Sequence, residues 1–306
     1  MIRRLRICET KLVESDAANA QIHVYVNPDE AEKRYLIDTL KLDEHTLNSA
    51  LDPDELARLE FEPEHLAMIL KRPRNYSSAD SFLFKVESTG LYLFKDLLVI
   101  VVPEETPLFE GRPFNRVRDL LDVVLKIIYR AIFHFEEHLR VINMISGELE
   151  QEINTSMTNK HLLNLFTLEK SLVYYLNAIS TNGKVVDKLR THATRIGFSP
   201  ENVEFIEDVA IENSQCYGQA EIYSQVLSGL MDARVSVVSN NLNVLMKTLT
   251  LVMIGIMLPT LVISVFSMNV KLPLEQEHSL VPFWIIMALA AISVLVVLGI
   301  WRHKKL

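Results

Sequence analysis

The sequence has few cysteines, no excess of positive charge and no apolar leader. Its two cysteines, Cys8 and Cys216, are far apart and match no metal-binding or redox spacing, so we expect a reduced cytosolic body. The net charge is −8, which argues against a nucleic-acid partner because phosphate binding needs a basic surface. Residues 1–6 are basic, but charged residues follow them where a signal peptide would have its apolar segment. We therefore expect no cleaved leader.

Sequence motifs of enzyme chemistry are also lacking. There is no glycine-rich phosphate loop and no nucleophile elbow. His134 and His138 are spaced to share one helical face, as zinc ligands would be. A metalloprotease has glutamate directly after the first histidine, however, and here Phe135 stands at that position. We therefore expect a packing helix at this point and no enzyme.

Proline is absent between Pro200 and Pro259, which predicts one long helix over Glu201–Phe266. Such a helix would be about 100 Å long, at 1.5 Å per residue. Only about a third of it fits in a hydrocarbon core of roughly 30 Å, so the rest is expected to project into the cytoplasm as a stalk. The alternative is an intramolecular bundle that folds back at a hinge at Gly229.

Long apolar runs are present only near the end of the chain. Leu249–Phe266 and Val281–Trp301 carry no charged residue, and each is long enough to cross a bilayer as a helix. A short hairpin that begins Ser267-Met268-Asn269 joins them. These features predict a two-helix membrane anchor attached to a larger soluble part.

Basic residues lie on the same side of both apolar runs. Lys247 precedes the first run, and Arg302-His303-Lys304-Lys305 follows the second. The hairpin has one lysine, Lys271, beside Glu275 and Glu277. Because basic flanks stay in the cytoplasm, we expect both termini inside the cell and the hairpin outside.

The rest of the chain predicts an α/β part followed by helices. Strands are expected at Ile22–Val26, His65–Leu70, Ser81–Val86 and Tyr92–Val102, short helices within Asp29–Leu51, and a hairpin turn at Ser88-Thr89-Gly90. Helices are expected at Pro113–Asn154, His161–Ile179 and Lys184–Thr194, with a break from Gly197 to Pro200. The predicted segments are an α/β domain (1–112), a helical domain (113–200), a stalk (201–248), a first span (249–266), an outer loop (267–280), a second span (281–301) and a basic tail (302–306).

A polar row runs along the predicted stalk and first span. Steps of four and three residues from Asp232 meet only polar or thioether side chains, whereas the flanking positions are aliphatic. At this spacing a row faces a common axis when helices supercoil, so it predicts a water-containing channel. The alternative is that serine and threonine in the spans bond their own backbone. The row is Asp232, Ser236, Ser239, Asn243, Met246, Thr250, Met253, Met257, Thr260 and Ser264.

The residues around this row resemble a known family. Ser239–Thr250 followed by Met257–Thr260 is similar to the stalk and first span of the CorA family of magnesium channels. That family ends its first span with glycine-methionine-asparagine, where this chain has Ser267-Met268-Asn269. The resemblance is strong over about 232–269 and architectural elsewhere. It implies an α+β membrane protein of the cytoplasmic membrane, a homopentameric funnel whose first spans line a pore for divalent cations, Mg²⁺ first among them.

The resemblance also implies roles for single residues. Asn243, Leu249, Met257 and Thr260 match pore-lining positions, and the polar row adds Thr250, Met253 and Ser264. Leu249 lies one residue away from that row. Ser267, Met268 and Asn269 stand at the selectivity filter, with Asn269 meeting the hydrated ion at the outer mouth. Asp232 matches an acidic ring low in the stalk.

A regulatory Mg²⁺ site between subunits is implied as well, with Asp208 as one carboxylate. The family pairs this carboxylate with an acidic dipeptide in the N-terminal domain, where a rough alignment places Asn48-Ser49 in this chain. The nearby acidic residues Asp43, Glu44, Asp52 and Asp54 are alternative partners, and the sequence leaves the choice among them open. Bound Mg²⁺ would hold the closed state until its cytosolic level falls.

The chemistry of Mg²⁺ agrees with these roles. Mg²⁺ releases its water reluctantly, so a pore should offer amide and carbonyl oxygens to its hydration shell, as Asn269 could. Leu249 and Met257 could close the pore by dewetting. Ser267 departs from the signature, since glycine there could adopt a positive φ.

Two other functions remain open. The same scaffold could carry Zn²⁺, Co²⁺ or Ni²⁺, although related zinc transporters have valine where this chain has Met268. A membrane-anchored scaffold or sensor could also have kept the architecture and lost conduction.

Overall fold

The structure is a computed structural model that describes residues 1–15, 20–76, 82–155, 159–268 and 280–304. The chain divides into two compact units, Met1–Met231 and Asp232–Leu306. The predicted Asn269 and the acidic residues of the hairpin lie outside the described residues.

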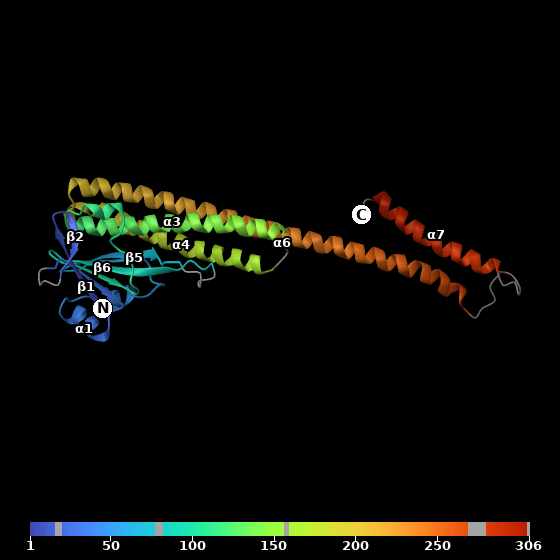
Figure 1. The fold of residues 1–306 in the computed structure, drawn as a ribbon, viewed down its shortest axis with the longest axis horizontal. Coiled ribbons are helices and arrows are strands. Elements are labelled where there is room, and N and C mark those ends of the chain that lie inside the picture. Colours follow the sequence, from blue (N-terminus) through green and yellow to red (C-terminus); the bar gives the residue numbers. More distant parts are fainter. Residues whose placement is uncertain (16–19, 77–81, 156–158, 269–279, 305–306) are drawn as a thin grey trace. The chain divides into compact units, whose positions relative to one another are not determined.

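The first unit is built on a seven-stranded mixed sheet (Figure 1). Its strand order is β2-β1-β3-β7-β6-β5-β4, and only the β3–β7 pairing is parallel. The strands are β1 (Ile2–Cys8), β2 (Lys11–Glu14), β3 (Ile22–Val26), β4 (Arg58–Phe61), β5 (Leu66–Pro73), β6 (Val86–Leu93) and β7 (Leu98–Val102).

Helices cover both faces of this sheet because its central strands are apolar on both sides. Along β7, Leu98 and Ile100 belong to a large core, whereas Val99 and Val101 belong to a smaller one. The short helices α1 (Glu30–Asp38) and α2 (Glu44–Ser49) cover the smaller core. On the other face, α3 (Leu120–Thr155), α4 (Asn159–Thr191) and the first part of α6 (Pro200–Phe266) run side by side (Figure 1).

The hairpin turn predicted at Ser88-Thr89-Gly90 is wrong, because these residues lie inside β6. The chain turns instead between β6 and β7, where the Phe94 N–H donates to the Leu97 carbonyl over 2.8 Å. Glycine at position 90 serves a different purpose. A Cβ there would lie 2.6 Å from the Ala50 Cβ, so α2 can approach the sheet only because residue 90 has no side chain.

Four other predicted element bounds need correction. The strand predicted over Tyr92–Val102 is divided by the turn between the end of β6 at Leu93 and the start of β7 at Leu98. Residues 82–85 do not form a strand, and β6 begins at Val86. The two helices predicted between His161 and Thr194 are one helix, α4, followed by the short α5 (Ala193–Ile196). A 3₁₀ turn, η2 (Arg112–Asn115), precedes α3, which begins at Leu120.

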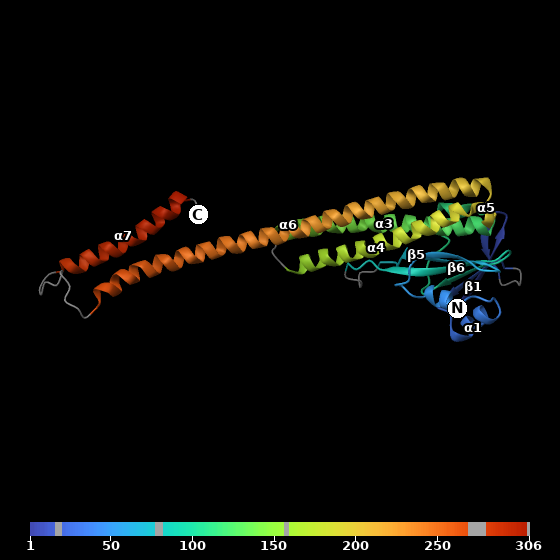
Figure 2. The same ribbon diagram turned by 180° about the vertical axis from the view of Figure 1, so that it is seen from behind.

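The long helix predicted after Pro200 is confirmed. Helix α6 extends without interruption over Pro200–Phe266, 67 residues, so the alternative of a hinge at Gly229 is wrong (Figure 2). The predicted break before it is confirmed too, because Gly197 caps α5 with φ +89°. The first part of α6 buries one face at heptad-like intervals: Asn202, Ile206, Val209, Asn213, Cys216, Ala220 and Leu227.

The second unit contains the last part of α6 and helix α7 (Val281–Lys304). Both helices are long and apolar enough to cross a membrane. A groove of about 220 Å³ lies between them, with Leu251 and Gly255 on one wall and Val294 and Leu298 on the other.

Candidate functional site

The polar row lies on the side of α6 that faces away from α7. Within the first apolar run, 249–266, the half-buried positions of α6 are Leu251, Gly255, Leu258, Pro259, Val262 and Phe266. The first two of them line the groove against α7. At about 100° per residue, the part of the polar row from Thr250 to Ser264 centres roughly 190° around the helix from this covered face. One side of the first apolar helix is thus packed on the second helix, while the opposite side carries the polar and thioether groups.

The side chains of this row are open to their surroundings in a single chain. Met257 is 67% exposed, Met246 58% and Met253 49%. Aliphatic neighbours such as Ile256 are equally exposed. A single chain therefore leaves most of the α6 surface uncovered in this unit, including the whole polar row.

The threonine hydroxyls of the row bond the helix itself. Thr250 Oγ1 donates to the Met246 carbonyl over 2.8 Å, and Thr260 Oγ1 donates to the Ile256 carbonyl over 2.7 Å. This is the backbone bonding that the sequence left open as an alternative. It uses the hydroxyl hydrogen only, so each oxygen keeps acceptor capacity for a hydrated cation.

Ser267 completes the last turn of α6. Its N–H donates to the Ile263 carbonyl over 3.1 Å, and its hydroxyl donates to the same carbonyl over 2.8 Å. Among the described residues, Ser267 is not one of those with positive φ. The serine therefore fits this backbone without strain, and its hydroxyl supports the helix end just before the predicted filter.

Asp208 lies on an exposed face of α6, within an acidic region of the first unit. Burial and then the charge of Glu212 raise the pKa of Glu136 on α3. Burial, followed by the charges of Glu212, Glu136 and Asp208, raises the pKa of Tyr129. The negative field around Asp208 is one that a divalent cation would relieve. Within the described part of a single chain, however, no three acidic, histidine or cysteine side chains gather as metal ligands.

The four alternative partners of Asp208 differ in what they already bind. Asp43 caps α2, and the Thr46 N–H holds the pKa of its carboxyl below the ordinary value. Asp52 accepts the Asp54 N–H over 2.9 Å in a tight turn. These bonds occupy Asp43 more fully than Asp52, and both Glu44 and Asp54 are exposed.

Two cationic side chains bind groups close to these acidic residues, and neither was predicted from the sequence. Lys71 is buried, and burial lowers the pKa of its ammonium to about 8. Its Nζ donates to the Pro53 carbonyl and so anchors the Asp52–Asp54 turn. Arg58 binds Glu55 at 2.7 Å and Glu60 at 2.8 Å. Glu55 and Glu60 flank Arg58 in the sequence, and this spacing could have predicted the pairing.

Asn48-Ser49, aligned with the acidic dipeptide of the family, does not form an acidic site. The Ser49 hydroxyl accepts from Arg58 at 3.0 Å and donates to Glu55 at 3.3 Å. A guanidinium thus stands beside this position. These residues do not fit a bound Mg²⁺, so a regulatory site would need one of the nearby acidic residues.

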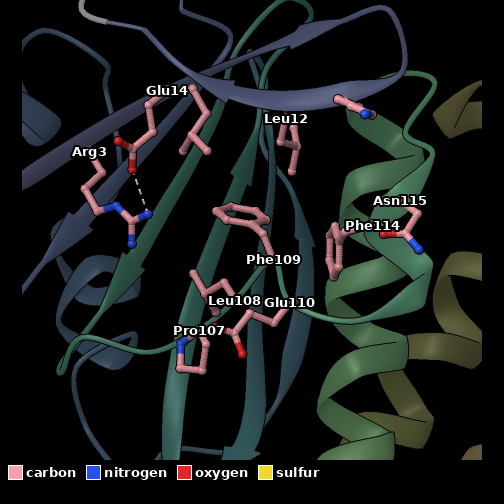
Figure 3. Close-up of a pocket in the computed structure, with 11 residues that line it drawn as sticks. Arg3, Leu12, Glu14, Pro107, Leu108, Phe109, Glu110, Phe114 and Asn115 are labelled. Atoms are coloured by element: carbon pink, nitrogen blue, oxygen red, sulfur yellow. Dashed lines mark hydrogen bonds and ion pairs between the residues drawn. The ribbon is translucent and has the colours of Figure 1, made fainter.

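A further cavity of the first unit is lined by none of the predicted site residues. It measures about 710 Å³ and lies between the β1–β2 hairpin and residues 107–115 (Figure 3). The rings of Phe109 and Phe114 meet edge to face at 5.7 Å, and Arg3 pairs with Glu14 at its rim. The lining carries both signs of charge and indicates no particular ligand.

Comparison with known proteins identifies the family. Residues 22–303 match the family described as CorA-like Mg²⁺ transporter protein. The chain belongs to the CorA family. Among curated proteins, the cobalt/magnesium transport protein CorA of Methanocaldococcus jannaschii is 23% identical over 279 residues, which is 84% of this chain and 82% of the relative.

Solved structures show the same CorA fold. The complete CorA magnesium transporter of Methanocaldococcus jannaschii has a TM-score of 0.80 at 20% identity and covers 98% of this chain and 96% of its own. The full-length CmaX protein has a TM-score of 0.73 at 13% identity and covers 100% and 97%. This CorA-family chain is therefore a transporter-type membrane protein with a soluble N-terminal unit, a long helix and a second apolar helix.

Proposed function

We propose that the chain is one subunit of a homopentameric channel for divalent cations, Mg²⁺ above all, that conducts passively into the cell. The channel would lie in the cytoplasmic membrane with both termini in the cytoplasm. The observation that carries this proposal is the position of the polar row on α6, opposite the face that α7 covers. A ring of such subunits can turn the row toward a common axis while α7 faces lipid.

The pore would be lined from the stalk to the outer mouth by one face of α6. Asp232 would form an acidic entrance ring, and Leu249 and Met257 would form the hydrophobic gate. Ser267, Met268 and Asn269 would form the filter, with the Asn269 amide facing the hydration shell of the ion. The remaining lining residues are Asn243, Thr250, Met253, Thr260 and Ser264.

Cytosolic Mg²⁺ would regulate the ring through Asp208. The negative charges of Asp208, Glu136 and Glu212 favour a bound cation there. A carboxylate of a neighbouring subunit would complete the site. The bonds already made by Asp43 favour Glu44, Asp52 or Asp54 as that partner. Bound Mg²⁺ would stabilise the closed ring because it binds this arrangement more tightly.

Transport of Co²⁺ by the same pore is the second candidate. The name of the curated relative, a cobalt/magnesium transport protein, favours it. Flux of Mg²⁺ and Co²⁺ into liposomes therefore has to be measured side by side. Flux of neither ion would favour a non-conducting scaffold.

Cysteine substitution tests the pore directly. In a background in which Cys8 and Cys216 are serine, Ser264→Cys and Met257→Cys should react with a water-soluble thiol reagent, and the reaction should block flux. Val262→Cys is the matched control, because position 262 lies on the face toward α7. Reaction at position 262 without reaction at 257 or 264 would overturn the proposed lining.

A further inference from the structure

The first unit contains a small cavity whose polar walls are all cationic or neutral. It lies between β5, α3 and the segment that follows β7, and it measures about 40 Å³. One wall is a single stripe of α3, namely Ile127, Arg130, Ala131 and His134. The others are Leu70, Arg72, Asn75, Thr106, Pro107 and Leu108. None of these lining residues is a carboxylate.

One buried donor at this cavity lacks a partner in the part of the chain that the structure describes. Arg72 is 5% exposed, and its terminal nitrogen Nη2 pairs with Glu87. Its Nε, by contrast, is buried without a hydrogen bond among the described residues. A buried donor of a charged group costs free energy unless an acceptor reaches it.

The charged side chains that line the cavity, Arg72 and Arg130, are cationic, and the carboxylates of Glu87 and Glu137 that pair with them do not line it. Burial and then the charges of His138, Arg130 and Arg72 lower the pKa of His134 to about 3. His134 is therefore neutral at physiological pH and can donate one ring N–H. Arg130 pairs with Glu137 on the side of α3, at 2.9 Å, and Glu137 does not line the cavity.

The size of the cavity restricts the ligand. A site that holds one water needs roughly 10–15 Å³ by the same measure, so this cavity has room for one or two small species. A nucleotide or an organic acid does not fit. A water could also satisfy Arg72 Nε, and the experiments below distinguish it from an anion.

We infer that this cavity is a binding site for a small inorganic anion, with chloride as the physiological candidate, held by Arg72, Arg130 and His134. The anion joins β5 to α3 and to the segment at Thr106, and so stabilises the first unit, the soluble part of the chain (the soluble unit). This role is independent of ion conduction by the second unit.

The test is the thermal stability of the full-length protein in detergent. Sodium chloride is replaced by sodium gluconate at equal ionic strength, and the Tm of the soluble unit is measured. We expect a Tm that is higher in chloride by about 3 °C or more and that rises with chloride until the site is full. Equal Tm values in the two salts would overturn the inference.

Two variants and one control locate the effect. Ala131→Val fills the cavity from α3, and Arg130→Gln removes one of its charges; both should lose the chloride dependence. Arg74→Gln removes an exposed charge that pairs with Glu104 and does not line the cavity, so it should keep the dependence. Retained dependence in both cavity variants would count against the site.

Crystals grown with bromide give an answer that does not depend on folding of the variants. Anomalous scattering at the cavity of the native protein would confirm an anion. Density there without an anomalous signal would show that water occupies the cavity, and the inference would be wrong.

Discussion

At the scale of single residues, the structure accounts for Ser267, the residue that we expected in place of a signature glycine. The backbone of Ser267 does not have a positive φ. Both its N–H and its hydroxyl bond the Ile263 carbonyl. The serine therefore stabilises the end of the first apolar helix and does not obstruct the chain there.

The first prediction follows from this local geometry. Ser267→Gly should change Mg²⁺ flux by less than about twofold and should destabilise the helix end by up to about 1 kcal/mol, because glycine loses the hydroxyl bond and gains freedom in the unfolded chain. Liposome flux and thermal unfolding measure the two effects. A tenfold rise in flux would show instead that the serine attenuates transport.

The second prediction concerns Asp208. Asp208→Asn should leave flux at low Mg²⁺ unchanged and should remove the inhibition by cytosolic Mg²⁺, because the amide no longer holds the cation. Asp187→Asn is the control, since Asp187 is also exposed and pairs with Arg190. Inhibition that persists in Asp208→Asn, or disappears in both variants, would reject the proposed site.

A third prediction concerns buried histidines of α3. Burial lowers the pKa of His138 to about 4, and its Nδ1 lies 2.6 Å from the Tyr175 hydroxyl. The unfolded chain binds a proton here near pH 6.5, and the folded chain does not. Stability of the soluble unit is therefore complete above about pH 6.5 and falls between about pH 6.5 and 4.

Equilibrium unfolding at pH 7, 6 and 5 checks this prediction. Each such histidine contributes at most about 1.4 kcal/mol per pH unit in that range. His138→Gln should flatten the slope, even if the variant is less stable at pH 7. An equal slope in both proteins would mean that other groups cause the acid sensitivity.

At the scale of elements, the sequence predicted well where one strong constraint acts over many residues. The proline-free run after Pro200 predicted α6, and the two uncharged runs predicted the apolar helices, because chain length and polarity decide both. Strand β6 was predicted wrongly because Gly90 was interpreted as a turn residue. Glycine is needed at position 90 because Ala50, at the end of α2, approaches it closely. This contact joins distant segments, so no local pattern reports it.

The same limit applies to the polar side chains that join elements. Asn182 on α4 reaches β5 and pairs with both backbone groups of Lys71, at 2.8 Å to its N–H and 2.7 Å to its carbonyl. Strand β4 pairs with β5 only as far as Ile69, so this asparagine supplies partners just beyond the end of β4. Nothing in the local sequence distinguishes Asn182 from the exposed Asn177 of the same helix.

The fourth prediction uses this pair of asparagines. Asn182→Ala should destabilise the soluble unit by about 2–4 kcal/mol, because two buried backbone groups of Lys71 lose their partners. Asn177→Ala, on the exposed side of α4, should cost less than about 0.5 kcal/mol. Chemical denaturation of both variants measures the difference. Equal effects would show that water replaces the Asn182 side chain.

At the scale of the whole molecule, the proposed conduction depends on assembly of several chains. The polar row and the aliphatic residues beside it are exposed in one chain, and apolar groups such as Met257 and Ile256 need either lipid or another subunit. Hydroxyl and amide groups at membrane depth are costly in lipid, so the row favours contact with water inside a ring.

The last prediction is that this ring has five members. Glutaraldehyde cross-linking in detergent should give a ladder that ends at five bands, and the particle should weigh about five times the 35.0 kDa chain.

With Cys8 and Cys216 changed to serine, Asn243→Cys should form disulfide-linked dimers on oxidation, because the row brings neighbouring copies of α6 together at the axis. Thr248→Cys should not, since Thr248 lines the groove beside α7. Monomers, or cross-linking at position 248 in place of 243, would mean that α6 does not surround a pore, and the conduction mechanism would fail with it.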